Sequence, residues 1–427
     1  MNSVLQSRRI YYGWVIVGIG LLSMGFWFGI RATFSVFYVA LLEEFSWGRG
    51  ESAGVQSAAL ITYTFMAPFI GGLIDRYGPR RIILPGIVIL SLGLALCASV
   101  NSLAQFYLFY GVVVGAGVTS ISIVSYTPIL AHWFEKKRGL ASGIAVSGSG
   151  LGTFLLVPFS QYFIIQWGWR STFLAWGGLV FIILFPVTLL FLRYRPQDMG
   201  LLPDGLQKPL QKPDVQSEER APSPPGREWT LRHVIKSGRF WCLVAFTALS
   251  LVGVYIIFVH SVRFLVDMGV DKMKAAYILA LVGIISSLFR IFWGGISDRI
   301  GREITFTMGM FCACMGVLSL ILLIHTMEPW CVYVFMGFFG AGWGATAPMF
   351  MAAATDIFKG RIFGLIYGIV EAGIGIAGAF GSWIGGFVYD RTQSYQWAFV
   401  IAFAAFALAC FFMWFAAPRK SNPIKTP

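Results

Sequence analysis

Apolar residues run in long blocks along the chain, and polar residues gather in the short segments between the blocks. A helix needs about 20 predominantly apolar residues to cross the roughly 30 Å hydrocarbon core of a bilayer. Twelve blocks reach this length, near residues 12–38, 52–74, 82–100, 104–130, 138–167, 171–193, 240–264, 273–296, 303–325, 329–355, 362–388 and 395–417. The pattern predicts an all-α membrane protein with twelve transmembrane helices.

One interruption between the blocks is much longer than the others. Between Arg193 and Phe240 the chain is polar and rich in proline, with too few apolar residues to pack on its own. We interpret residues 195–239 as a linker on the cytoplasmic side. The linker divides the chain into an N-terminal six-helix bundle, residues 1–194, and a C-terminal six-helix bundle, residues 240–427.

The two predicted bundles contain an internal repeat. Residues 63–78 (YTFMAPFIGGLIDRYG) align without a gap on residues 286–301 (SSLFRIFWGGISDRIG), and the tripeptide GAG occurs at 115–117 and again at 340–342. The offset is 223 residues for the first pair and 225 for the second. Agreement of offset across separate helices indicates duplication. Two pseudo-symmetric halves are typical of transporters that rock about a binding site near the membrane midplane.

Composition and charge support a membrane protein of defined orientation. Hydrophobic residues make up 57% of the chain and charged residues only 12%, which excludes an ordinary soluble domain. With the N-terminus inside, 24 of the 32 Lys and Arg residues fall on the cytoplasmic side, and only Arg31 and Arg290 fall within blocks. This asymmetry predicts a multi-pass protein of the cell membrane, here a bacterial inner membrane, with both termini cytoplasmic. The net charge of +13 therefore gives no reason to expect a nucleic-acid partner.

The residues that carry enzyme or metal chemistry do not form a pattern. The four histidines are scattered, the six cysteines lie within or at the ends of blocks, and the chain has no HExxH, GxSxG or P-loop motif. We expect no enzymatic activity, no metal and no cofactor. A membrane sensor would need a signalling domain, for which the linker and tail are too short.

Two loops carry the same motif. Residues 71–81 (GGLIDRYGPRR) follow the second block, and residues 294–302 (GGISDRIGR) follow the eighth. Each motif places an acid at a helix end beside a glycine turn, with basic residues at the level of the lipid headgroups. With these motifs the chain resembles the major facilitator superfamily over essentially its full length. The resemblance implies a gating role, through charge pairs with a neighbouring helix, for Asp75, Arg76, Asp298 and Arg299.

Three further features resemble the monocarboxylate transporter family and its relatives near the oxalate/formate exchangers. The first is the segment of residues 25–38, which begins with GFWF and ends with SVFY. The others are residues 133–145 (WFEKKRGLASGIA) and Arg290, four residues before Gly294. The chain departs from the mammalian members at two positions. They carry a lysine near Ala32, where this chain has Arg31 one place earlier. They also carry an acid one turn before the arginine of the eighth span, where this chain has Ser286. Proton coupling is therefore expected to depend on another residue.

Arg290 is a fixed positive charge inside an apolar block. It aligns with Ala67 in the internal repeat, so the duplication does not account for it. It lies eight residues before Asp298, or about 12 Å along a helix, somewhat to the cytoplasmic side of the bilayer centre. A guanidinium binds a carboxylate through two parallel hydrogen bonds. We predict that Arg290 anchors a substrate carboxylate, with Ser286 in the same site; the alternative is a structural ion pair with a buried acid.

Three other ionisable residues are candidates for function. Glu371 is the clearest acid within a block, and burial would favour its protonated form while a nearby arginine would oppose it. We consider Glu371 a proton carrier, with a permanent ion pair as the alternative. Arg31 either attracts substrate anions or anchors its helix end at the membrane interface. His260, at the outer end of the seventh block, is either a proton-linked gate or a satisfied interfacial residue.

Uncharged residues complete the predicted site. Tyr126, with Ser125 beside it, lies about two turns inside the fourth block, and the family resemblance implies that such a tyrosine donates to the substrate carboxylate. We expect nearby Pro128 to loosen this helix. The apolar part of the cavity is expected to be lined by Phe28, Trp343, Met349 and Phe350.

These features predict proton-coupled symport of a small monocarboxylate, such as lactate or pyruvate, by alternating access in a monomer. A monoanion moving inward against the membrane potential costs about 2.3 kcal/mol per 100 mV, and a co-transported proton removes that cost. Exchange of oxalate- or formate-type anions is the first alternative, because a dicarboxylate would favour two facing cations. Efflux of an amphiphile is the second alternative, favoured if Arg290 is dispensable.

Overall fold

The computed structural model describes residues 11–134, 138–205, 231–358 and 363–416. The first half contains α1 (Gly13–Phe45), α2 (Arg49–Tyr77), α3 (Pro79–Cys97), α4 (Leu103–Phe106), the π-helix η1 (Tyr107–Val114), α5 (Gly115–Ser120), α6 (Ile123–Trp133), α7 (Arg138–Phe191) and the short 3-10 turns η2 (Pro196–Met199) and η3 (Pro203–Gly205). The second half contains α8 (Leu231–Lys236), α9 (Gly238–Asp267), α10 (Lys272–Ile300), α11 (Arg302–Thr326), α12 (Trp330–Ile357), α13 (Phe363–Thr392) and α14 (Gln396–Ala416).

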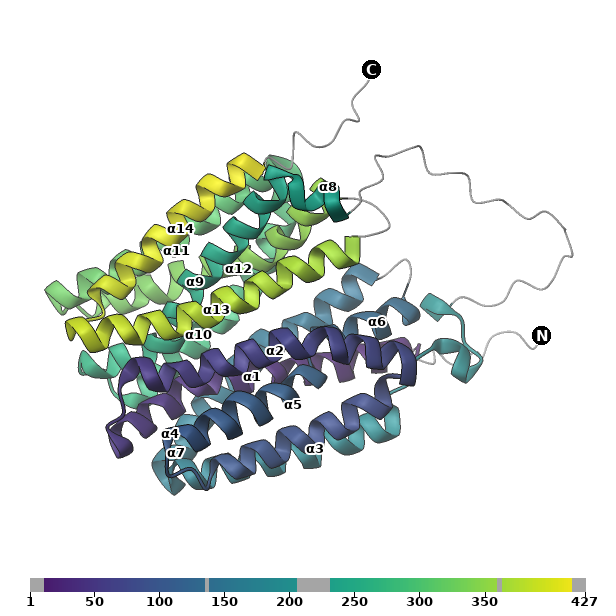
Figure 1. The fold of residues 1–427 in the computed structure, drawn as a ribbon, viewed down its shortest axis with the longest axis horizontal. Helices are drawn as coiled ribbons and strands as arrows, with labels where there is room; N and C mark the ends of the chain where they lie inside the picture. Colours follow the sequence, from purple (N-terminus) through teal and green to yellow (C-terminus); the bar gives the residue numbers. More distant parts are fainter. Residues whose placement is uncertain (1–10, 135–137, 206–230, 359–362, 417–427) are drawn as a thin grey trace, which may run out of the picture.

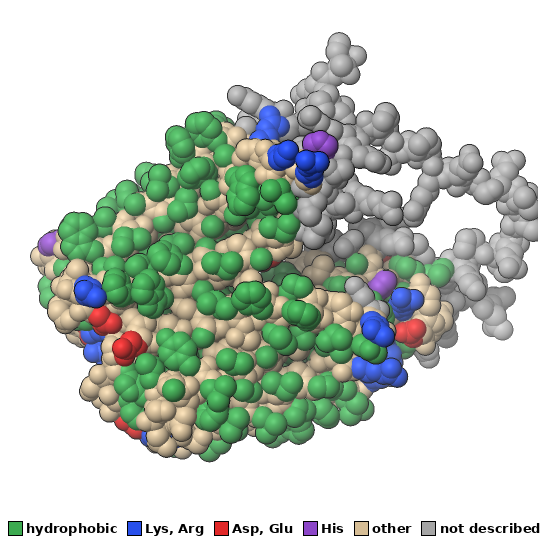
Figure 2. All heavy atoms as spheres, in the orientation of Figure 1, with side chains coloured by type: hydrophobic (Ala, Val, Ile, Leu, Met, Phe, Trp, Pro, Cys, Tyr) green, Lys and Arg blue, Asp and Glu red, His purple; other side chains and the backbone are tan. Residues whose placement is uncertain are grey.

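The predicted fold class is confirmed. Within the described ranges, eleven helical segments are long and apolar enough to cross a membrane, and one of them is the 54-residue helix α7. This helix contains two of the predicted spans, joined at Gly168, whose φ of 77° lies in the left-handed region that favours glycine. Figure 2 shows an apolar surface along the length of the helices, with charged side chains gathered at the two ends. The protein is therefore a multi-pass membrane protein.

The helices form two groups, α1 to α7 and α9 to α14 (Figure 1). Each group has its own apolar core, built around residues such as Trp133 in the first and Phe246 in the second. The exact predicted boundaries at 194 and 239 stay predictions, because residues 206–230 lie outside the described ranges. We call the end of the bundle near α6 and α8 the linker end, and the opposite end the distal end.

The two motif loops at the linker end have matching conformations. Gly78 follows α2 with φ 83°, and Gly301 follows α10 with φ 99°. Both values are unfavourable for residues with a side chain, so each position requires glycine. The turns inferred from the repeated motif are thus present at equivalent places in the two halves.

The fourth predicted span is not one continuous helix. It consists of α4, the π-helix η1, α5 and α6, and the helix is interrupted at Ile121 and Ser122. Ser122 has an extended backbone, and its hydroxyl accepts a 3.3 Å hydrogen bond from the backbone N–H of Val124 at the start of α6. The interruption therefore lies before Pro128, which sits inside α6.

The two groups meet along the middle and the distal end of the bundle. In the middle, α7 crosses α10 where a Cβ added to Gly150 would lie 1.7 Å from the Ser287 hydroxyl, and α13 crosses α2 where a Cβ on Gly375 would lie 1.8 Å from the Thr64 hydroxyl. Toward the linker end the groups diverge in Figure 1, and Figure 2 shows the surface hollowed between them. The molecule is closed at the distal end and open toward the linker end.

Candidate substrate-binding site

Arg290 lies on α10 at the point where the two groups separate. Its Nη1 donates a 3.0 Å hydrogen bond to the Ser149 hydroxyl of α7, in the other half of the molecule. Its Nε is buried and has no hydrogen-bond partner. No carboxylate in the described ranges forms an ion pair with it, so the predicted alternative of a structural ion pair is not what this conformation contains. Arg290 is a partly buried cation whose buried Nε is an unused donor.

Neighbouring contacts fix the position of this arginine. One turn further along α10, Trp293 donates a 2.8 Å hydrogen bond to the carbonyl of Ala341 on α12. A Cβ added to Gly344 of α12 would lie 2.7 Å from the carbonyl oxygen of Ser286, so the two helices approach closely there. The Ser286 hydroxyl itself donates to the Gly283 carbonyl within α10 at 2.8 Å and is 1% exposed. Ser286 is close to Arg290 along the helix, but its hydroxyl is hydrogen-bonded to the backbone of its own helix.

A cluster of three aromatic rings lies beside Arg290. The guanidinium carbon is 5.6 Å from the centre of the Trp343 ring, and Trp343 is 5.7 Å from Phe28 and 5.5 Å from Phe258. The rings come from α12, α1 and α9, so the cluster bridges the two halves. Phe28 and Trp343 therefore lie beside Arg290, and their role in lining the cavity stays a prediction. Met349 and Phe350 are buried in the core of the second half, to which Trp343 also belongs, and their lining role likewise stays a prediction.

Arg31 is connected to this cluster through its neighbours, because Trp27 lies 5.7 Å from Phe28 and Tyr255 lies 6.3 Å from Phe258. Its Nη2 donates a 3.0 Å hydrogen bond to the Tyr255 hydroxyl of α9, and its guanidinium lies 5.4 Å from the Trp27 ring and 5.2 Å from the Tyr63 ring. Of the two alternatives for Arg31, anchoring of a helix end does not fit this structure, because α1 continues to Phe45 and Arg31 is only 9% exposed. Its role toward substrate anions stays a prediction. Like Arg290, Arg31 forms no ion pair with a carboxylate in the part of the chain that the structure describes.

Glu371 lies on α13, four residues before the crossing at Gly375. Its charge acts on the phenol of Tyr63, whose ring also faces Arg31. The carboxyl is partly buried. The structure thus brings together a carboxylate from the second half, an aromatic ring from α2 and a cation from α1.

Tyr126 and Ser125 are placed inside the first half. The Tyr126 hydroxyl forms a 2.6 Å hydrogen bond with the Ser23 hydroxyl of α1, and Tyr126 is 1% exposed. The neighbouring Ser125 is fully buried, and its hydroxyl has no partner. In this conformation Tyr126 contacts Ser23 rather than Arg290, so its expected role with the carboxylate stays a prediction.

His260 lies away from Arg290, near the distal end. Its Nε2 is 2.8 Å from the Ser382 carbonyl, and its Nδ1 is 3.5 Å from the Tyr38 hydroxyl. Because a carbonyl oxygen only accepts, Nε2 carries the hydrogen in the neutral ring. The residue is fully buried between the two halves, so it is not interfacial. Its proton-coupling role stays a prediction.

The four predicted gating residues lie in the last turns of α2 and α10. The side chains of Asp75 and Asp298 lie outside the part of the structure that is described. Arg76 and Arg299 are exposed at the linker end, and the Arg76 guanidinium lies 5.1 Å from the Tyr77 ring. Their gating role is therefore still a prediction.

Sequence reasoning missed Ser149 and Tyr255, the direct partners of the two arginines. Both are neutral side chains in apolar helices, so neither stands out in the sequence as the partner of a charge. Tyr63 opens the repeated segment opposite Ser286, but a tyrosine in a membrane helix gives no signal of its own. Only the three-dimensional arrangement identifies these residues.

The sequence of this chain matches a family model over nearly its whole length. The model of the Major Facilitator Superfamily matches residues 15–367 and 333–427. The chain belongs to the major facilitator superfamily. The resemblance inferred from the repeated motif is confirmed, and the protein is a membrane transporter by family and fold.

Relatives of this superfamily member include several monocarboxylate transporters. Monocarboxylate transporter 13 of Bos taurus is 26% identical over 403 residues, which cover 93% of this chain and 87% of the relative. Monocarboxylate transporter 4 of Mus musculus is 26% identical over 416 residues, covering 92% and 80%. The structure is similar to that of a bacterial homolog of the human lysosomal transporter Spinster, with a TM-score of 0.74, 16% identity and coverage of 97% and 98%. It is also similar to a D-xylose-proton symporter, with a TM-score of 0.73, 17% identity and coverage of 94% and 97%.

Proposed function

We propose that this transporter carries a small monocarboxylate, of the lactate or pyruvate kind, together with a proton by alternating access. The observation that carries the proposal is Arg290, whose buried Nε has no hydrogen-bond partner and whose guanidinium has no carboxylate partner in the described structure. A substrate carboxylate would satisfy its unused donor through charge-assisted hydrogen bonds. The similarity to monocarboxylate transporters supports the same substrate class.

Charge balance gives a reason for proton coupling. The site holds two cations, Arg31 and Arg290, and one acid, Glu371. An empty carrier with ionised Glu371 has a site charge of plus one. A carrier loaded with a monoanion and with protonated Glu371 also has a site charge of plus one. Because both forms then cross with equal charge, one proton per monocarboxylate makes transport electroneutral and independent of the membrane potential.

The positive residues support an orientation for this proposal. They concentrate at the linker end, which would place that end and both termini in the cytoplasm of a bacterial inner membrane. The described conformation would then be open to the inside. The protein would act as a monomer, because each chain supplies both halves of the site.

Uptake of labelled lactate and pyruvate by proteoliposomes tests the proposal. We expect an acidic exterior to drive accumulation by the wild-type protein. Glu371→Gln should lose this dependence on the pH gradient while it still exchanges labelled for unlabelled substrate, because exchange needs no proton release. Glu328→Gln, an exposed acid between α11 and α12, is the matched control and should behave as the wild type. Accumulation that ignores the pH gradient would refute proton coupling.

Exchange of a small dicarboxylate is the second candidate. It is favoured by one observation, namely two cations that each lie against aromatic rings, Arg31 against Trp27 and Arg290 against Trp343, neither of them paired with a described carboxylate. Such a protein would exchange oxalate across the membrane without a pH gradient and would lose this activity in both Arg31→Ala and Arg290→Ala. Oxalate counterflow without lactate accumulation would favour this candidate over the first.

A further inference from the structure

The first residue of α2 binds the second half of the molecule through its backbone. The N–H of Arg49 donates to Asp390 Oδ1 at 2.8 Å, and the N–H of Gly50 donates to Asp390 Oδ2 at 2.7 Å. Asp390 lies on α13, in the other half. The first N–H groups of a helix have no partner within that helix, and an ionised acceptor makes stronger hydrogen bonds with them. Asp390 therefore caps α2 across the boundary between the halves.

The Arg49 side chain binds the same half at other points. Its Nη1 donates to Asp267 Oδ2 at 2.5 Å and to the Tyr395 hydroxyl at 3.0 Å. Its guanidinium carbon lies 3.5 Å from the centre of the Tyr389 ring. The side chain is 13% exposed, so water screens these contacts only in part. Arg49 is thus held by residues from α9, from α13 and from the segment between α13 and α14.

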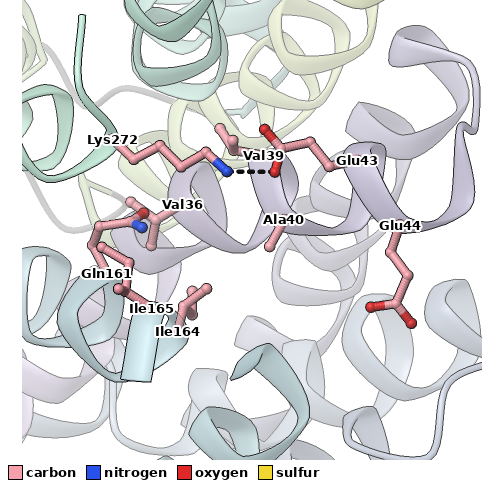
Figure 3. Close-up of a pocket in the computed structure, with 9 residues that line it drawn as sticks. All are labelled: Val36, Val39, Ala40, Glu43, Glu44, Gln161, Ile164, Ile165 and Lys272. Atoms are coloured by element: carbon pink, nitrogen blue, oxygen red, sulfur yellow. Dashed lines mark hydrogen bonds and ion pairs between the residues drawn. The ribbon is translucent and has the colours of Figure 1, made fainter. Parts of the chain in front are cut away.

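Another group of charges at the distal end is much more open to solvent. Lys272 Nζ lies 2.5 Å from Glu43 Oε2, and the two side chains are 43% and 39% exposed. Figure 3 shows this pair at a cavity of about 360 Å³ formed by α1, α7 and α10. Exposed ion pairs contribute little, because water competes for both partners. The Glu43–Lys272 pair therefore provides a matched control for Arg49.

We propose that Arg49, Asp390 and Asp267 form the latch that keeps the distal end closed. The residue that is held belongs to the first half, and the residues that hold it belong to the second. Any rocking of the halves that opens the distal end must break these bonds. Tyr38 links the latch to the interior, because its hydroxyl donates to the Arg49 carbonyl at 3.0 Å and lies near His260. The latch is independent of which substrate the central site binds.

Ser52 provides a reporter for the latch. It follows Arg49 by three residues on α2, is 1% exposed, and its hydroxyl has no hydrogen-bond partner. We would introduce Ser52→Cys into the full chain after replacing the six native cysteines and measure its rate of labelling by a polar maleimide in nanodiscs. Ser250→Cys, in the buried interior of α9, is the reporter for general unfolding.

The latch predicts a specific order of labelling rates. Arg49→Ala should raise labelling of Ser52→Cys about tenfold, the factor that corresponds to 1.4 kcal/mol. Asp390→Ala should also raise it several-fold, because the cap of α2 is lost. In Lys272→Ala, the labelling rate of Ser52→Cys should stay within about twofold of the rate in the protein with the intact latch, as expected for an exposed ion pair. Labelling of Ser250→Cys should not change in any of these variants.

Three results would overturn the proposal. Unchanged labelling of Ser52→Cys in both Arg49→Ala and Asp390→Ala would show that other contacts hold the distal end closed. An equal rise in Lys272→Ala would show that the exposed charges matter as much. A parallel rise at Ser250→Cys would show that Arg49 supports the fold rather than a gate. None of these measurements requires a substrate, so failure of the latch and failure of the proposed monocarboxylate transport are distinguishable.

Discussion

At the scale of single residues, the two arginines of the central site are unequal. Arg31 donates a hydrogen bond to the Tyr255 hydroxyl, and its guanidinium lies against the rings of Trp27 and Tyr63. Arg290 has a single hydroxyl acceptor, Ser149, and one aromatic neighbour. A buried donor without a partner costs about 1–3 kcal/mol, so Arg290 gains more than Arg31 from an arriving anion.

The fork geometry of Arg290 leads to a prediction about charge and shape. Arg290→Lys keeps the charge but cannot form two parallel hydrogen bonds to a carboxylate. We expect kcat/KM for lactate uptake to fall roughly tenfold or more, the consequence of losing one charge-assisted hydrogen bond worth about 1.5–3 kcal/mol. Arg391→Lys, at an exposed arginine of α13, is the matched control and should be neutral. Equal activity of Arg290→Lys and the wild type would show that charge alone suffices.

At the scale of helices, the first half depends on the close crossing of α1 and α7. A Cβ added to Gly152 of α7 would lie 2.0 Å from the carbonyl oxygen of Gly25, and one added to Gly148 would lie 2.0 Å from the carbonyl of Leu21. Backbone atoms cannot move aside as a flexible side chain can. The crossing places Phe28 of α1 and Ser149 of α7 in the central site.

This crossing predicts opposite effects of the same substitution at two positions of α7. Gly152→Ala must push the helices apart and should lower the free energy of unfolding by about 1–3 kcal/mol, seen as a lower thermal midpoint. Gly143→Ala meets no atom within 4 Å and should be neutral or slightly stabilising, because alanine favours the helix. A thermal midpoint for Gly152→Ala equal to that of Gly143→Ala would contradict the crossing.

The helices were predictable from the sequence to a greater extent than their interior contacts. Apolar length determines membrane spans, so twelve crossings could be counted, and the repeat singled out Arg290. The interruption at Ser122 could not be predicted, because no apolar pattern distinguishes an extended residue from a helical one. The partners of Arg31 and Arg49 are likewise hidden, because Tyr255 and Asp390 are 224 and 341 residues away along the chain. Contacts across a duplicated fold depend on the packing of both halves.

At the scale of the whole molecule, the two halves meet at one end and diverge at the other in the described conformation (Figure 1 and Figure 2). The distal end is closed by the latch residues, and the linker end is open in Figure 2. In the proposed mechanism, the site has the same charge in the empty and in the loaded carrier. The membrane potential would then favour neither form when the carrier changes conformation.

This equality predicts electroneutral transport. In proteoliposomes with a potassium gradient and valinomycin, an imposed potential should leave the rate and extent of lactate uptake unchanged at fixed pH gradient. One uncompensated charge would instead change accumulation about 50-fold per 100 mV, the factor that corresponds to roughly 2.3 kcal/mol. Protein-free vesicles treated in the same way supply the control for leakage. A potential-dependent accumulation of that size would exclude the one-proton stoichiometry.

The interruption of the fourth span also bears on how the two halves diverged. Between the GAG tripeptide and the following lysine, the first half has 18 residues, 118–135, whereas the second half has 16, 343–358. In the second half this region belongs to the continuous helix α12, whereas in the first it contains the interruption at Ile121 and Ser122. Two additional residues in a continuous helix would rotate all following side chains toward other neighbours. An interruption of the helix accommodates the two residues without this rotation. The helix start at Ile123, deep within the bundle, is therefore a feature of the first half that the described part of the second half lacks.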